Sequence, residues 1–101
     1  MKFKIYGPFE IPMDNKNGLL DDKAVKKFWN EAGECSKACG CYLFAVKAAK
    51  GIKPWYVGAA NQLTFSQEAL KKEKLKMYDN IISKRKGTPI LFLIARKNKY
   101  W

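Results

Sequence analysis

Histidine is absent from this sequence. Its absence excludes Ser-His-Asp triads and Cys-His pairs, because imidazole is the base that activates the nucleophile in both. It also excludes His-ligated zinc sites and the common metalloprotease motifs. Any acid–base chemistry must therefore come from Tyr, Lys, Asp, Glu or Cys.

Long apolar segments are absent as well. No apolar run approaches the ~20 residues that a membrane-spanning helix needs, and no signal-peptide-like stretch follows residues 1–4. We therefore expect a cytoplasmic protein without a membrane partner, folded as a single domain over residues 1–101. Hydrophobic residues make up 48% of the chain, which is enough for a modest core.

Cysteine is scarce and clustered, with Cys35, Cys39 and Cys41 as the three members. An odd number of cysteines without a secretion signal argues against a disulfide framework. The Cys-x3-Cys-x-Cys spacing could bind a metal only with a fourth ligand from Glu34, from an acid elsewhere in the fold or from a second chain. We favour the alternative that Cys41 is a small hydrophobe within an apolar strand, because neither half of a paired zinc motif is present.

Acidic residues are few in this sequence. The chain has 20 Lys and Arg residues against 9 Asp and Glu residues, which gives a formal charge of +11. Such an excess predicts a nucleic-acid partner, bound mainly through the release of counterions. Tyr100 and Trp101, among the terminal lysines, could stack on bases. The candidate binding residues are Lys71, Lys72, Lys76, Lys84, Arg85 and Lys86, although a run of lysines can also be a solvated helix face.

Alternation and apolar runs predict four strands. They are expected at residues 2–6, 40–46, 55–58 and 90–95, and Gly7-Pro8 should end the first of them. The second and third strands should form a hairpin around a Gly-containing loop. The last strand is apolar on both faces, so we expect it to be the buried, central one.

Two helices are expected between these strands. The first begins at residue 21 or 22 and stops at Gly33, and the second covers residues 66–85 behind a capping box of Thr64 and Gln67. The order of elements predicts an α+β domain, in which a small, largely antiparallel sheet of three to four strands is flanked by helices.

Lys74 stands out in the second helix. It lies four residues from both Leu70 and Tyr78, in the middle of an otherwise apolar arc. One interpretation is that the helix breaks near residue 73, or that Lys74 extends its ammonium group to the edge of the arc. The other is that Lys74 points into a cleft over the sheet, beside Tyr78, and meets an anionic ligand.

Two Gly/Tyr motifs lie on the expected hairpin. They read Gly40-Cys41-Tyr42 and Trp55-Tyr56-Val57-Gly58, with 13 residues between the two tyrosines. The pair, followed by a helix and a strand, resembles the paired motif of the GIY-YIG nucleases. The similarity extends over nearly the whole chain and favours a bacterial branch of GIY-YIG-like proteins.

The resemblance implies an activity and roles for several residues. GIY-YIG domains cut DNA with one divalent metal, usually Mg²⁺ and here Mg²⁺ or Mn²⁺, while a tyrosine takes or relays the proton of the attacking water. Tyr56 then matches the general base, Tyr42 its partner on the hairpin, and Gly58 the glycine that lets the backbone approach phosphate. Lys74 and Tyr78 complete the candidate catalytic set. Since free tyrosine ionises only near pH ~10, a base role requires a metal or cations nearby.

The chain also departs from the GIY-YIG pattern. Ala59 stands where many relatives have Lys, and the Arg expected at the start of the following helix is missing. The family's metal-binding Glu lies on a helix after the last strand, and here the nearest acid, Glu68, lies on an earlier helix. The metal ligand is therefore unassigned, and the chain is either a fragment or a shortened relative without the C-terminal helix.

Three functions remain open at this point. The first is a metal-dependent DNA endonuclease that hydrolyses phosphodiester bonds. The second is a nucleic-acid-binding module that derives from such an enzyme but does not cut. The third is a protein-interaction domain with a basic surface.

Overall fold

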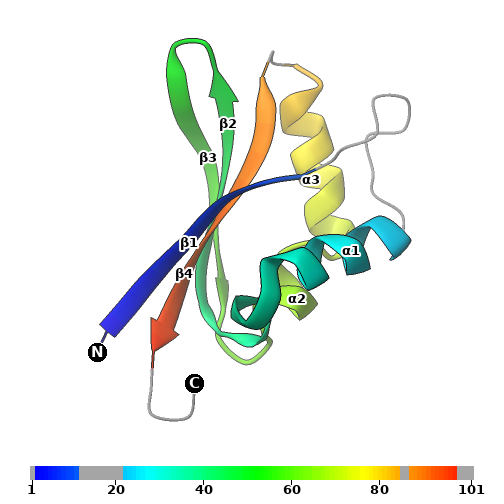
Figure 1. Ribbon diagram of the computed structural model, residues 1–101. Helices are drawn as coiled ribbons and strands as arrows, with labels where there is room; N and C mark the ends of the chain where they lie inside the picture. The colour runs from blue at the N-terminus through cyan, green and yellow to red at the C-terminus, as the bar shows by residue number, and fades with distance from the viewer. Residues whose placement is uncertain (1, 12–21, 85–86, 98–101) are drawn as a thin grey trace.

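A four-stranded antiparallel sheet with helices on one side forms the protein (Figure 1). The computed structural model describes residues 2–11, 22–84 and 87–97. The strands are β1 (Lys2–Glu10), β2 (Gly40–Ala48), β3 (Gly51–Ala60) and β4 (Thr88–Lys97), in the spatial order β1-β4-β2-β3. The helices are α1 (Asp22–Ala32), the 3₁₀ helix η1 (Gly33–Lys37), α2 (Phe65–Glu68) and α3 (Lys72–Ile82). The expected α+β class is confirmed.

Strand β4 occupies the position that its composition predicts. It pairs with β1 on one side and with β2 on the other, and its Leu91 and Leu93 are fully buried. A strand between two neighbours, with a helix layer over one face, has little contact with water. An apolar run such as residues 90–95 suits that place.

Strands β1 and β3 are longer than expected, and both are edge strands. Gly7-Pro8 does not end β1: the register shifts between Tyr6 and Phe9, and the strand continues to Glu10. Gly7 has a φ of 114°, which is accessible to glycine, and an edge strand tolerates the missing N–H of Pro8. Strand β3 likewise runs through Pro54 with a register shift opposite Phe44 and Ala45.

The prediction of one continuous helix over residues 66–85 is wrong. Helix α2 ends at Glu68, Lys71 is extended with ψ 161°, and α3 begins at Lys72. The Tyr78 hydroxyl donates a hydrogen bond of 2.9 Å to the carbonyl of Ala69, which compensates for the helical bond lost at the break. The alternative of a helix break is thus confirmed, but the break lies at residues 69–71 rather than near residue 73, and Lys74 is inside α3. The capping box of Thr64 and Gln67 is confirmed at the start of α2.

The core lies between the sheet and the helices. Phe28 and Trp29 of α1 are buried, and the rings of Phe44 (β2) and Tyr78 (α3) stack with centroids 4.2 Å apart. Helix α1 gives way to η1 at Gly33, whose φ of 81° is in the left-handed region. The apolar faces of helices and sheet therefore fix the position of α3 over the β2–β3 hairpin.

The opposite face of the sheet has no helix over it in the described part of the chain (Figure 1). The pairing of Ile5 with Ile94, and of Leu43 with Val57, places these apolar side chains on that face. Ile5 is 65% exposed and Val57 is 64% exposed. This face is an apolar surface in contact with solvent.

Three further expectations concern cysteines, metals and membranes. Cys35, Cys39 and Cys41 are all free thiols, and burial raises the pKa of Cys35. Among the residues that the structure describes, no group of three or more His, Cys, Asp or Glu side chains could hold a metal ion. Nor does any described helix have the length and apolar character needed to cross a membrane.

Candidate functional site

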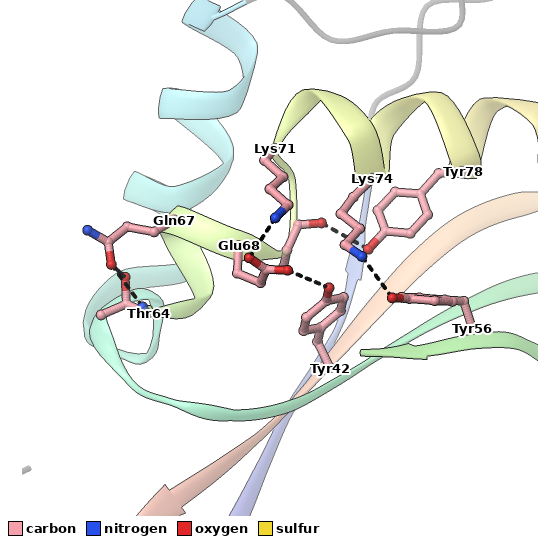
Figure 2. A network of polar contacts seen from close by, with 9 residues as sticks. Tyr42, Tyr56, Thr64, Gln67, Glu68, Lys71, Lys74 and Tyr78 are labelled. Carbon is pink, nitrogen blue, oxygen red and sulfur yellow. Dashed lines mark hydrogen bonds and ion pairs between the residues drawn. The ribbon is translucent and has the colours of Figure 1, made fainter. Parts of the chain in front are cut away.

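Four elements bring a group of polar side chains together on the helix side of the sheet. Tyr42 comes from β2, Tyr56 from β3, Glu68 from α2 and Lys74 from α3 (Figure 2). Tyr56 pairs with Phe44, two residues along the strand from Tyr42, so the two tyrosines share one face of the hairpin. Their ring centroids are 6.1 Å apart. We call this group, together with Lys71, the tyrosine–lysine cluster.

The contact between Lys74 and Tyr56 joins α3 to β3. The Lys74 ammonium group donates a hydrogen bond of 2.8 Å to the Tyr56 hydroxyl oxygen and lies 5.0 Å from the centroid of its ring. Both side chains are half-buried. Because an ammonium group in a partly dry environment attracts negative charge strongly, this contact can stabilise charge that develops on the tyrosine oxygen.

Tyr42 and Tyr78 are fully buried. Burial raises the pKa of Tyr42 above its ordinary value, and the neighbouring Tyr56 and Glu68 raise it further. Burial also raises the pKa of Tyr78, whose hydroxyl donates a hydrogen bond to the carbonyl of Ala69. Neither side chain can contact a bulky substrate, and both favour the neutral phenol. Of the three candidate tyrosines, only Tyr56 combines solvent access with a cation on its hydroxyl.

Glu68 completes the cluster. Its Oε1 lies 3.5 Å from the Tyr42 hydroxyl, and its Oε2 forms an ion pair of 3.0 Å with Lys71. The Glu68 side chain is 14% exposed and that of Lys71 is 39% exposed. The hydrogen bond to Glu68 raises the pKa of Lys71. With one carboxylate and two ammonium groups, the cluster carries a net positive charge and should attract an anion.

The cluster has one carboxylate, so the metal site that it allows is one in which a single carboxylate and the substrate phosphates share the ion. Mg²⁺ is often held by one or two carboxylates that act together with substrate phosphates. Glu68 fits that pattern as a lone carboxylate, with the Lys71 ammonium group as a competitor for the same side chain. Sequence reasoning set Glu68 aside because it lies on an earlier helix than the metal-binding Glu of the GIY-YIG family. The structure places Glu68, the last residue of α2, beside Tyr42.

Gly58 has a packing role. A Cβ atom built at this residue would lie 2.2 Å from the Tyr42 ring carbon Cζ and 2.4 Å from its hydroxyl oxygen. Only glycine leaves room for the Tyr42 ring to lie across β3 and reach Glu68. The structure thus gives a reason for glycine in the second motif that does not involve phosphate.

The basic residues of the 71–76 segment separate into two groups. Lys72 and Lys76 are exposed and share one side of α3, since they are one turn apart. Lys74 lies two residues from each and therefore points to the opposite side, toward β3. Lys84 is exposed beyond the end of α3. Arg85 and Lys86, like Tyr100 and Trp101, lie outside the described residues.

Comparisons of the chain with protein-family models, curated proteins and solved structures found no match. The resemblance to GIY-YIG nucleases therefore stays a prediction that depends on the two Gly/Tyr motifs. The function has to be argued from the chemistry of the tyrosine–lysine cluster.

Proposed function

We propose that this protein is a GIY-YIG-like domain that acts on DNA and hydrolyses phosphodiester bonds. The observation that carries the proposal is the contact between the Lys74 ammonium group and the Tyr56 hydroxyl. It supplies the cation that a tyrosine base requires in a chain without histidine. The net positive charge of the cluster and of the whole chain supports a polyanionic substrate.

In the proposed reaction, the Tyr56 oxygen in its phenolate form takes a proton from the attacking water. The water oxygen forms a bond to phosphorus, and the bond from phosphorus to the leaving deoxyribose oxygen breaks. The leaving oxygen then acquires a proton from solvent. Lys74 offsets the charge on the Tyr56 oxygen, and Lys71 adds positive charge where the phosphate would bind.

A divalent metal belongs to this proposal. Glu68 would hold Mg²⁺ or Mn²⁺, and such an ion supplies Lewis-acid stabilisation to phosphate oxygens. Tyr42 is a positioning residue, because its hydroxyl lies beside Glu68 Oε1 and its buried ring cannot reach the substrate. Gly58 acts indirectly, because the absence of a Cβ leaves space for the Tyr42 ring.

A nucleic-acid-binding module without cleavage is the second candidate. The ion pair between Glu68 and Lys71 favours it, because that pair occupies the only carboxylate among the described residues of the cluster. A basic protein-interaction domain is the third candidate, and the exposed Ile5 and Val57 on the open sheet face favour it.

Nicking of supercoiled plasmid tests the proposal. Wild-type protein, Tyr56→Phe and Glu68→Gln are compared in Mg²⁺, in Mn²⁺ and in EDTA. Tyr6→Phe serves as the matched control, since Tyr6 lies on β1 at the opposite edge of the sheet. We expect metal-dependent nicking by the wild type and by Tyr6→Phe, and its loss in the other two variants.

Each other outcome contradicts the proposal or the role of Tyr56. If no protein nicks the plasmid while all of them bind DNA at low salt, the binding module replaces the enzyme. If none of them binds DNA either, the interaction domain is favoured. If Tyr56→Phe nicks as fast as the wild type, the assignment of the base is wrong.

A further inference from the structure

A hollow lies on the β2–β3 hairpin, outside the tyrosine–lysine cluster. Its volume is about 400 Å³, which lies in the range of ligand-binding pockets. Val46, Ile52 and Trp55 contribute apolar surface, and Lys50 and Lys53 contribute positive charge. None of the described residues that line it is acidic. An apolar wall beside two cations suits a ligand with a flat apolar part and an anionic part.

Trp55 provides the flat surface. It is half-buried and packs against the core, so its ring is held in place. The Lys53 ammonium group lies 5.0 Å from the centroid of the Trp55 ring. A nucleobase that stacks on this ring would take the position of the ammonium group. The phosphate attached to that nucleotide would then give Lys53 a new partner.

The hairpin connects this pocket to the tyrosine–lysine cluster. Tyr56 pairs with Phe44 and Pro54 pairs with Ala45, so Trp55 is the extra residue of a bulge. Both Trp55 and Tyr56 pack against the same core on the helix side of the sheet. One strand of nucleic acid could therefore place a base on Trp55 and an adjacent phosphate near Tyr56 and Lys74.

We propose that the Trp55–Lys53 pocket binds one unpaired base of the DNA strand that the cluster acts on. The inference rests on the proposed function and makes it more specific. A base inside a continuous duplex is stacked between its neighbours and cannot also stack on Trp55. The substrate class is thus DNA with a single-stranded segment beside the phosphodiester bond. Negatively supercoiled plasmid exposes such segments where its strands open, whereas a relaxed, intact duplex is a poor substrate.

Fluorescence anisotropy with labelled oligonucleotides tests this proposal. The probes are an oligodeoxythymidylate and a blunt duplex of equal length, at one fixed salt concentration. Trp55→Ala should weaken single-strand binding by about 5- to 150-fold, the equivalent of one lost stacked base, and leave duplex binding unchanged. Trp55→Phe keeps an aromatic ring and should retain part of the affinity.

Two further variants separate stacking from charge and from misfolding. Lys53→Gln should also weaken single-strand binding, whereas Lys76→Gln, on the side of α3 away from Lys74, should change the affinity for the two probes by the same factor. Thermal unfolding of Trp55→Phe shows whether the fold is intact. Equal losses for both probes, or no loss in a folded Trp55 variant, would overturn the proposal.

The readout is independent of cleavage. If the wild type does not nick plasmid and single-strand binding still depends on Trp55, base binding in the pocket is supported and the proposed hydrolysis is rejected. If plasmid is nicked and the Trp55 variants bind both probes like the wild type, hydrolysis is supported and base binding in the pocket is rejected.

Discussion

The ammonium group of Lys74 is hydrogen-bonded to the hydroxyl of Tyr56 over a distance of 2.8 Å. Lys74 belongs to α3 and Tyr56 to β3, so the contact depends on how the helix packs across the hairpin. It explains why a lysine occupies an otherwise apolar arc of α3. The same contact places a cation on the hydroxyl of Tyr56, the second tyrosine of the paired motifs. No other described residue with a positive charge donates a hydrogen bond to this hydroxyl.

Lys71, the residue before α3, and Lys72, the first residue of α3, should contribute differently to DNA binding. Lys71→Gln removes a cation from the cluster and leaves the Glu68 carboxylate without its ion pair. The affinity for DNA should therefore fall, and the slope of log K against log salt concentration should become shallower by about 1. Lys72→Gln removes the same charge from the side of α3 that faces away from Lys74. Its slope should stay at the wild-type value. Anisotropy titrations over a series of salt concentrations measure both slopes, and identical effects would contradict the assigned binding face.

Gly58→Ala should destabilise the protein by about 1–3 kcal/mol. The new Cβ would collide with the Tyr42 ring, 2.2 Å from Cζ, and a well-packed core relieves such overlap only by distortion. Urea unfolding measures the loss. In a Tyr42→Leu background the ring is absent, so the cost of the same substitution should fall. An equal cost in both backgrounds would show that the contact with Tyr42 is not its cause.

Alkaline pH should destabilise the wild type through its buried tyrosines. Tyr78 has a pKa raised above the ordinary value of about 10, so the unfolded chain loses this proton first as the pH rises. The free energy of unfolding should therefore decline from about pH 10 upward. Tyr78→Phe loses about 1 kcal/mol near pH 8, because the bond to Ala69 is gone, and should show a shallower decline. Parallel pH profiles would contradict this account.

Much of the fold follows from local pattern. The apolar residues of β4 predicted the burial of this strand, Gly33 marked the end of α1, and the capping box marked the start of α2. The sequence allows a break near residue 73 as one interpretation of Lys74, but the helical periodicity of residues 66–85 does not show that the break lies at residues 69–71. The break is caused by tertiary contacts: Ala69 and Leu70 are buried, and the hydroxyl of Tyr78 donates a hydrogen bond to the carbonyl of Ala69.

The candidate site was only partly visible in the sequence. The paired motifs and the position of Lys74 in an apolar arc led to Tyr42, Tyr56 and Lys74. Glu68 lies beside Tyr42 through a contact between α2 and β2, and sequence periodicity does not reveal such a contact. The role of Trp55 depends on a bulge that turns it to the side of Tyr56, and strand alternation alone predicts the reverse.

The most direct test of the account is plasmid nicking by Lys74→Gln and Lys76→Gln. Both substitutions remove one positive charge from α3, but only Lys74 contacts the hydroxyl of Tyr56. The account predicts that Lys76→Gln nicks supercoiled plasmid in Mg²⁺ at close to the wild-type rate and that Lys74→Gln, although folded, does not. Equal nicking by the two variants would contradict the central role of the contact between Lys74 and Tyr56.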